Sequence, residues 1–272
     1  MSPSSGISAR YRELLSELHR AFQAPFSVAD ASDLWGVERQ RGRRLLAHLA
    51  SQGWLTRVRR GWYSTVPLAA THPSERRQDP WLVAWKLFGP GYLGGWTACE
   101  HWGLTEQIFS DVMMFTTREV RSRAQTIQGT RYVLRVIPED RMFGLASVWR
   151  EGTRVQVSDP SRTIVDILNE PALGGGIRHV AQVLVEYMGS DHRDDGTLID
   201  FIRRLGNRTI AKRLGFILEA CRAEAPEVMA FCRENVSAGY SKLDPDVGAP
   251  GRIVRRWNLA VNVLLAGPEG SA

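Results

Sequence analysis

The chain has 272 residues, of which 43% are hydrophobic and 24% charged, and its formal net charge is +6. These values favour two domains with buried cores and exclude a disordered or fibrous protein. No apolar run reaches the roughly 18 residues that a membrane-spanning helix needs, and the first residues lack the apolar core of a secretory signal, so we expect a cytoplasmic protein with no membrane partner.

The positive charge is concentrated near the N-terminus. Residues 1–70 contain ten Arg and no Lys against five acidic residues, whereas the remaining 202 residues hold 25 basic and 24 acidic side chains. Arginine makes planar, bidentate contacts with phosphate and guanine, although a GC-rich genome would also favour it over lysine. Genome composition does not explain the clustering, so the first quarter of the chain is expected to meet an anionic partner.

Two helices are predicted at the start of the chain. Apolar residues at helical spacing predict a first helix over 8–22. Ser27 is a suitable N-cap for a second helix that runs through Trp35. Gly36 then provides a turn, because glycine enters left-handed conformations at little cost. Glu38 is placed to cap the start of a third helix, or to favour it by its charge.

The third helix ends at Gly53 and is followed by a predicted hairpin. Its strands are 54–58 and 62–66, which alternate apolar and polar residues around the basic bend 59–61. Three helices followed by such a hairpin are the elements of a winged helix-turn-helix. We therefore predict a winged helix-turn-helix over residues 1–66 and an α+β protein as a whole.

Basic side chains occur at both places where a winged helix touches DNA, the third helix and the wing. Leu45, Leu46 and Leu49 of the third helix are expected to face the core, which leaves its polar residues outside. Residues near the helix start would meet base edges, and wing arginines would neutralise phosphates in a salt-dependent way. A basic face used for protein contacts is the alternative. The predicted DNA-binding residues are Arg39, Gln40, Arg41, Arg43, Arg44, Arg57, Arg59 and Arg60, with Arg39, Gln40, Arg43 and Arg44 expected to read bases.

Residues 67–80 are rich in Pro, Ser, Ala and charged residues, which is typical of a linker between domains. Residues 81–272 are predicted to form a larger mixed α/β domain, with an antiparallel or mixed sheet flanked by helices. Helices are expected at 81–88, 97–102, 177–188, 196–205, 207–220 and after Asp159-Pro160, and strands at 112–117, 132–137, 154–157 and 253–263, with a Gly-rich turn at 89–95.

Metal and cofactor sites are not expected in this second domain. Cys99, Cys221 and Cys232 are odd in number and lack the paired spacing of zinc ligands, so buried thiols in a reducing compartment are predicted. The segment 189–195, GSDHRDD, has the residue types of a nucleotidyltransferase site, but it falls between two predicted helices and is interpreted as a polar loop. The glycines at 174–176 lack the Lys and hydroxyl residue of a phosphate-binding loop.

Two further pairs are interpreted as structural. Glu100 and His101 have no accompanying nucleophile and are flanked by tryptophans, so a packed helix is predicted there. Arg162 and Asp166 are spaced i, i+4 and are predicted to form an ion pair on a helix surface, worth a few tenths of a kcal/mol. We therefore expect no enzymatic activity.

An ordered series of segments resembles the AbiEi family, the antitoxins of type IV (AbiE) toxin-antitoxin and abortive-infection systems of bacteria. The similarity covers roughly residues 10–265. No single segment identifies the family, but the order in which the segments follow one another is specific for it. The segments are GWLTRVRRGWY, GYLGGWTACEHWGLTEQ, VMMFTTR, RYVLRVIPEDRMFG, VWREGTRVQVSDPSRTIVDIL, RLGNRTIAKRLGFILE and RWNLAVNV.

The resemblance implies two roles. The N-terminal domain would bind inverted repeats in its own promoter and repress the operon, with two protomers expected on a two-fold operator. The C-terminal domain would counter a cognate nucleotidyltransferase-like toxin without forming a stable complex with it. The resemblance supplies no catalytic residues. The alternatives are a winged-helix regulator whose C-terminal domain senses a ligand or oligomerises and, less favoured, a nucleotidyltransferase-like enzyme.

Gly42 departs from the pattern of a recognition helix, in which a β-branched core residue is common at this position. Glycine lowers helix propensity by about 1 kcal/mol relative to alanine. Its presence implies either a less rigid third helix or a close approach to a neighbouring helix.

Overall fold

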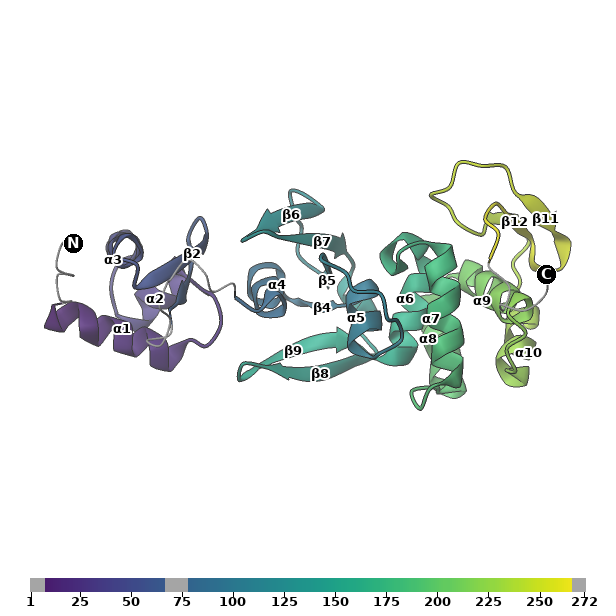
Figure 1. The fold of residues 1–272 in the computed structure, drawn as a ribbon, viewed down its shortest axis with the longest axis horizontal. Coiled ribbons are helices and arrows are strands. Elements are labelled where there is room, and N and C mark those ends of the chain that lie inside the picture. The colour runs from purple at the N-terminus through teal and green to yellow at the C-terminus, as the bar shows by residue number, and fades with distance from the viewer. Residues whose placement is uncertain (1–7, 67–77, 266–272) are drawn as a thin grey trace.

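The structure is a computed structural model that describes residues 8–66 and 78–265, and the chain in it is a mixed α+β protein. Figure 1 shows an elongated arrangement, with the N-terminal elements at one end, a sheet in the middle and a group of helices at the other end. Most of the predicted linker, 67–77, lies outside the described residues. No helix within the described ranges is long and apolar enough to cross a membrane.

The N-terminal unit, residues 8–66, combines three helices with a three-stranded antiparallel sheet. One cluster of buried side chains joins all of these elements, and it includes Leu18, Phe26, Leu46 and Tyr63. The sheet order is β1-β3-β2. The elements are α1 (Ala9–Ala21), β1 (Phe26–Ser27), α2 (Val28–Leu34), α3 (Arg39–Ser51), β2 (Leu55–Arg59) and β3 (Trp62–Thr65).

Local signals set the helix boundaries of this unit. Ser27 caps α2 through a reciprocal capping box, in which the Asp30 backbone N–H donates to Ser27 Oγ at 3.1 Å and Asp30 accepts from the Ser27 backbone N–H at 2.7 Å. Gly36 and Gly53 have φ angles of 60° and 79°, as the two predicted turns require. Glu38 does lie at the N-cap of α3, but its side chain makes no capping hydrogen bond.

Gly42 lies where α3 crosses α2. It is buried, and a Cβ atom built on it would collide with the hydroxyl oxygen of Ser32, which is itself completely buried. The Ser32 hydroxyl has no hydrogen-bond partner. Of the two explanations that the sequence left open for this glycine, the structure supports the close approach to a neighbouring helix.

Gly42→Ala is expected to destabilise the N-terminal unit by about 1–2 kcal/mol, because overpacking against Ser32, which typically costs about 1–3 kcal/mol, outweighs the gain of about 1 kcal/mol in helix propensity. Urea unfolding followed by circular dichroism measures the change. Ser32→Ala removes the colliding atom and an unpaired hydroxyl, so Gly42→Ala in that background should recover most of the loss. Equal destabilisation in both backgrounds would contradict the assigned contact.

A six-stranded mixed sheet forms the middle of the molecule, with strand order β6-β7-β5-β4-β9-β8. The pairs β4–β9 and β5–β7 are parallel and the others antiparallel. Helix α4 packs on this sheet through Leu82, Val83 and Leu87. The elements are α4 (Pro80–Phe88), β4 (Gly91–Leu93), α5 (Trp96–His101), β5 (Val112–Thr116), β6 (Ala124–Ile127), β7 (Thr130–Val136), the 3-10 turn η1 (Glu139–Arg141), β8 (Leu145–Arg150) and β9 (Thr153–Ser158).

Several sequence expectations for this region need correction. The predicted Gly-rich turn contains β4, which is buried between β5 and β9. The edge strands β6 and β8 were not predicted at all. Helix α4 begins at Pro80, one residue earlier than predicted, and Asp79 caps it by accepting the Trp81 backbone N–H at 2.8 Å.

Five helices build the third part of the molecule around the largest buried cluster, which contains Ile164, Leu184, Leu214 and Trp257. Helix α10 was not predicted. The helices are α6 (Pro160–Asn169), α7 (Ile177–Gly189), α8 (Asp195–Leu205), α9 (Arg208–Ala220) and α10 (Pro226–Glu234), with the 3-10 turn η2 (Pro171–Gly174) after α6. Asp159 caps α6, as its position before Pro160 predicted.

The predicted final strand, 253–263, is wrong. The segment is divided by the 3-10 turn η3 (Arg255–Trp257) and by Asn258, whose φ is 48°. The two short strands on either side, β11 (Arg252–Val254) and β12 (Leu259–Val261), pair with one another in an antiparallel way. Together with β10 (Ser241–Lys242) they form a small sheet of order β10-β12-β11.

Arg162 and Asp166 of α6 are not on the surface, which overturns the predicted exposed ion pair. Their side chains are 1% and 4% exposed, and Arg162 Nε lies 2.9 Å from Asp166 Oδ1. Tyr92 of β4 closes the group, because its hydroxyl donates to Asp166 Oδ2 at 2.9 Å and accepts from Arg162 Nη2 at 3.0 Å. Arg162 also donates to the Phe143 carbonyl at 3.2 Å and packs over the Phe143 ring. This group links the central sheet to the helices.

Contacts also join the N-terminal unit to α4. Val58 of β2 and Ala24 belong to the buried cluster of α4 and the central sheet rather than to that of their own unit, and Trp62 packs against the same cluster. The register of the β2–β3 ladder shifts between Arg57 and Arg59, which is a β-bulge around Val58. Val58, which lies at this shift, is thus the residue of β2 that packs with α4.

Candidate nucleic-acid interface

Helix α3 has one apolar face and one polar face. Gly42, Leu46 and Leu49 are buried on the inner side, as expected for the two leucines, whereas Leu45 is only half-buried. Since each residue turns an α-helix by about 100°, Gln40 and Arg44 lie on the side opposite these three.

Arg41 and Arg43 lie on the two flanks of this outer face. All four polar side chains, Gln40, Arg41, Arg43 and Arg44, are exposed. Small residues, Ala47 and Ser51, continue the outer face for the rest of the helix, and both are also exposed. The outer face is therefore basic near the helix start and free of bulky apolar groups along its length.

Arg39 differs from the other residues of the helix. Its Nη2 atom lies 3.1 Å from Asp33 Oδ1, and the two side chains are 54% and 72% exposed. An ion pair this exposed contributes roughly 0–1 kcal/mol, so a phosphate could replace Asp33 with little loss. Its angular position places Arg39 nearer the buried face than Arg44, which makes a backbone contact more compatible with the geometry than base reading.

The predicted wing corresponds to the β2–β3 hairpin. Arg57 and Arg60 are exposed, and Gly61 completes the bend with a φ of 80°. Because β2 follows α3 directly after the turn at Gly53, the hairpin and the helix belong to one compact unit with a shared apolar cluster. Two arginines on this hairpin are thus free to contact an anionic backbone.

Arg59, the remaining predicted residue, lies apart from these seven. It is half-buried, and its guanidinium carbon lies 5.6 Å from the centroid of the Phe88 ring and 5.9 Å from that of Trp62. Burial lowers the pKa of Arg59, and the nearby positive charge of Arg118 lowers it further. The side chain therefore points towards α4 and the central sheet rather than out with Arg57 and Arg60.

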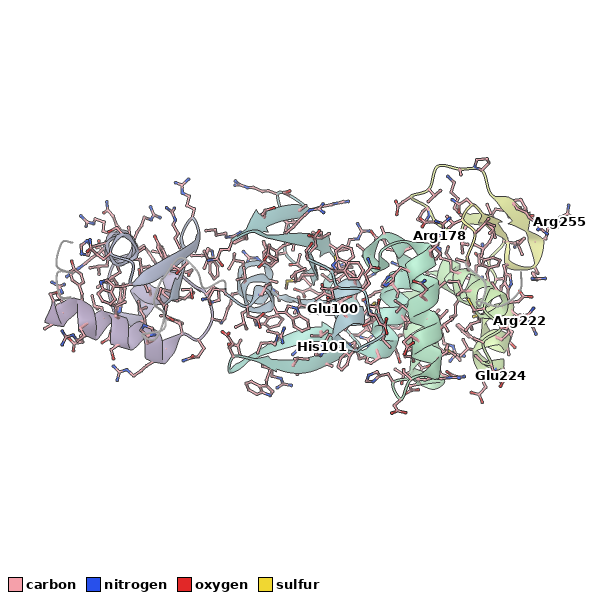
Figure 2. The ribbon with its side chains drawn as sticks, viewed as in Figure 1. Glu100, His101, Arg178, Arg222, Glu224 and Arg255 are labelled. Atoms are coloured by element: carbon pink, nitrogen blue, oxygen red, sulfur yellow. The ribbon has the colours of Figure 1, made fainter. Side chains whose placement is uncertain are left out.

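Glu100 and His101 lie in the middle of the molecule, far from α3 (Figure 2). The His101 ring packs against Trp81 and Trp102, with centroids 5.1 Å and 4.6 Å apart. Burial lowers the pKa of His101, and Arg150 lowers it further. These contacts agree with the packed helix that the sequence predicted.

The carboxylates of the GSDHRDD segment have structural partners. Asp194 caps α8 by accepting the Thr197 backbone N–H at 2.9 Å and the Thr197 hydroxyl at 2.7 Å. Asp195 forms a bidentate pair with Arg193, both contacts being 2.9 Å. Gly189 ends α7 and Asp195 begins α8, and the residues between them form the loop that was predicted between the two helices.

The three cysteines are free thiols. Cys99 and Cys232 are buried, which raises the pKa of each to about 12, whereas Cys221 is only partly buried. Within residues 8–66 and 78–265, no group of three or more His, Cys, Asp or Glu side chains is arranged to hold a metal ion.

Comparison of the chain with protein-family models and with curated proteins finds no match. The basic outer face of α3 together with the exposed arginines of the β2–β3 hairpin is the most concentrated group of predicted site residues that the structure brings together. It contains six of the eight predicted residues, whereas Arg39 lies nearer the buried face of α3 and Arg59 points towards α4.

Proposed function

We propose that the protein is a DNA-binding antitoxin that represses its own type IV toxin-antitoxin operon. In this proposal residues 8–66 are a winged helix-turn-helix, with α3 as the recognition helix and the β2–β3 hairpin as the wing. The observation that carries the proposal is the outer face of α3, where exposed Gln40, Arg41, Arg43 and Arg44 lie opposite a buried apolar face. Basic residues on the adjacent wing also support DNA binding by this unit.

The dimensions of α3 suit the major groove of DNA. Its 13 residues span about 20 Å, and the groove, at about 12 Å wide, admits an α-helix. Arg44 would contact guanine O6 and N7, and Gln40 would contact adenine, which are the preferred partners of these side chains. Arg41 and Arg43 on the flanks, with Arg57 and Arg60 on the wing, would neutralise phosphates on both sides of the groove.

The antitoxin half of the proposal is supported by the resemblance to the AbiEi family, whose matching segments continue from the wing to β12. In this proposal the C-terminal domain, predicted over residues 81–272, counters a nucleotidyltransferase-like toxin. Asp194 caps α8 and Asp195 pairs with Arg193, so the GSDHRDD segment, which most resembles a catalytic site, is better explained by a structural role.

A gel-shift titration of the full chain against about 200 base pairs of its own upstream DNA tests the first half. Binding should be at least about a thousandfold tighter than to unrelated DNA of the same length. With four arginines of each protomer neutralising phosphates, and two protomers expected on the operator, affinity should also fall by at least about a thousandfold between 50 and 200 mM salt. Equal affinity for both DNAs would overturn the proposed operator.

Growth rescue tests the second half separately. The chain is expressed from a foreign promoter in cells that carry the nucleotidyltransferase-like toxin gene that the proposal places beside it. We expect restored growth, and the same restoration by the variant Arg43→Ala/Arg44→Ala, because rescue would not need operator binding. Failure of both proteins to rescue, at equal expression, would overturn the antitoxin role and leave the DNA-binding role in place.

A further inference from the structure

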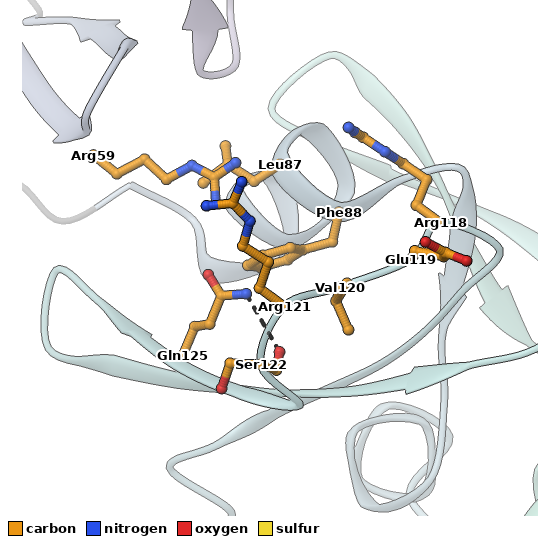
Figure 3. A pocket seen from close by; sticks show the side chains of 9 residues that line it. All are labelled: Arg59, Leu87, Phe88, Arg118, Glu119, Val120, Arg121, Ser122 and Gln125. Atoms are coloured by element: carbon orange, nitrogen blue, oxygen red, sulfur yellow. Dashed lines mark hydrogen bonds between the residues drawn. The ribbon is translucent and has the colours of Figure 1, made fainter.

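An arginine-lined hollow lies where the N-terminal unit meets the central sheet (Figure 3). Its volume is about 410 Å³. One wall is the end of β2, which carries Arg59. The second wall is the C-terminal end of α4, with the ring of Phe88. The third is the loop between β5 and β6, which carries Arg118 and Arg121.

The charges of this hollow are unbalanced. Three guanidinium groups line it against one carboxylate, Glu119. In the part of the chain that the structure describes, no acidic group lies within ion-pairing distance of Arg59, Arg118 or Arg121. Arg118 donates a hydrogen bond of 3.3 Å to the Gly89 carbonyl, which holds it beside α4 without neutralising its charge.

Three clustered guanidinium groups repel one another unless an anion lies between them. Arg59 is half-buried, and its pKa is lowered by burial and by the charge of Arg118, so this guanidinium has lost part of its hydration without gaining a carboxylate. Figure 3 shows the side chains of Arg59 and Arg121 pointing towards one another from opposite walls. A dianionic group between them would accept hydrogen bonds from both walls.

Size and the remaining lining define the class of ligand. A volume of about 410 Å³ falls at the lower end of the range for small-molecule sites. The Phe88 ring offers an apolar surface, and the Gln125 amide, which donates to the Ser122 carbonyl at 3.4 Å, offers a polar edge. We propose that the hollow binds a small phosphate-bearing anion of up to nucleotide size, with Arg59, Arg118 and Arg121 holding the phosphate.

The position of the hollow gives such a ligand a mechanical effect. Arg59 belongs to the β2–β3 hairpin, whereas the other two arginines belong to the central sheet, so one anion would join the two parts of the molecule. It would reinforce the packing of Val58 and Trp62 against α4. A resulting change in operator affinity rests on the proposed function, but binding of the anion itself does not.

Isothermal titration calorimetry of the full chain at 150 mM NaCl, with pyrophosphate, ATP and GTP as separate probes and sulfate as the ionic control, tests the proposal. We expect at least one phosphate probe to bind with a Kd below about 1 mM and sulfate to bind more weakly. A nucleotide that binds about tenfold tighter than pyrophosphate would identify a nucleotide site. Equal affinities would identify a site for the phosphate group alone.

Matched variants locate the binding. Arg118→Ala/Arg121→Ala should weaken binding at least about tenfold. Arg123→Ala removes an exposed arginine of the same loop that does not line the hollow, and it should leave binding unchanged. Thermal unfolding of both variants confirms that they are folded. No binding of any phosphate probe, binding retained in the double variant, or equal loss in both variants would overturn the site, whatever the result with operator DNA.

Discussion

Replacing Arg43 and Arg44 together by alanine is expected to abolish operator binding, with affinity lowered at least about a hundredfold. Arg44 points directly away from the buried face of α3 and Arg43 lies on its flank, and both are exposed. A bidentate arginine–guanine contact discriminates by about 1–3 kcal/mol, and each lost phosphate contact removes a released counterion. Gel-shift titration against the upstream DNA measures the loss.

The fold should survive this double substitution. Alanine has the higher helix propensity, and surface changes away from caps and buried networks usually alter stability by less than about 0.5 kcal/mol. The matched control is Arg252→Ala/Arg255→Ala, which removes the same charge from exposed positions in β11 and η3. Figure 2 shows Arg255 at the far end of the molecule from the N-terminal unit. Near-native binding by the Arg43/Arg44 variant, or an equal loss in the control, would show that α3 is not the contact.

Asp166→Ala is expected to lower the free energy of unfolding by about 3–5 kcal/mol, the largest effect on stability that we predict. Complete burial raises the pKa of Asp166 to about 6, and Arg162 opposes this increase, so the carboxylate is ionised at neutral pH. Removing it leaves the Arg162 guanidinium buried at 1% exposure with only neutral partners, Tyr92 and the Phe143 carbonyl. Urea unfolding followed by tryptophan fluorescence measures the change.

A double substitution separates the ion pair from its neighbours. Arg162→Met/Asp166→Leu removes both charges and fills the space with apolar groups, so it should be clearly more stable than Asp166→Ala, because the unpaired buried charge is gone. A double variant that is as unstable as Asp166→Ala, or less stable, would show that the unpaired charge of Arg162 is not the cause of the loss. A loss below about 1 kcal/mol in Asp166→Ala would place the pair on the surface, where the sequence pattern alone had put it.

Local signals predicted much of the fold. The Ser27 N-cap, the turn at Gly36, the end of the third helix at Gly53 and the Asp159-Pro160 helix start depend on a few adjacent residues, and each lies where the sequence predicted it. Proline at the first position of α10, Pro226, is a signal of the same kind that could have identified the missed helix. Elements whose boundaries are encoded within one turn are thus accessible from sequence.

The missed strands depend on their neighbours. β4 has three residues within a Gly-rich segment, and it is a strand because β5 and β9 pair with it on both sides. β6 and β8 lie at the two edges of the central sheet, where partial exposure weakens the apolar alternation that marks a strand. Such strands are specified by pairing with segments distant in sequence rather than by their own residues.

The residues of the candidate interface could be predicted from the sequence, whereas the position of Arg59, the burial of Arg162 and the arginine-lined hollow could not. Five of the eight predicted residues lie on one helix, so helical geometry alone places them near one another. The position of Arg59 depends on a β-bulge and on Phe88, and the burial of Arg162 depends on Tyr92, which is 70 residues away. The arginine-lined hollow was missed for the same reason, because Arg118 and Arg121 meet Arg59 through tertiary packing.

Methylation interference on the upstream DNA tests the central claim, that α3 reads bases in the major groove. Methylation of guanine N7 blocks an acceptor that faces this groove and leaves the phosphates intact. We predict that methylation of particular guanines, repeated with two-fold symmetry, prevents binding by the full chain. If methylation of no guanine changes the affinity, Arg44 does not read guanine. The protein would then contact only the DNA backbone.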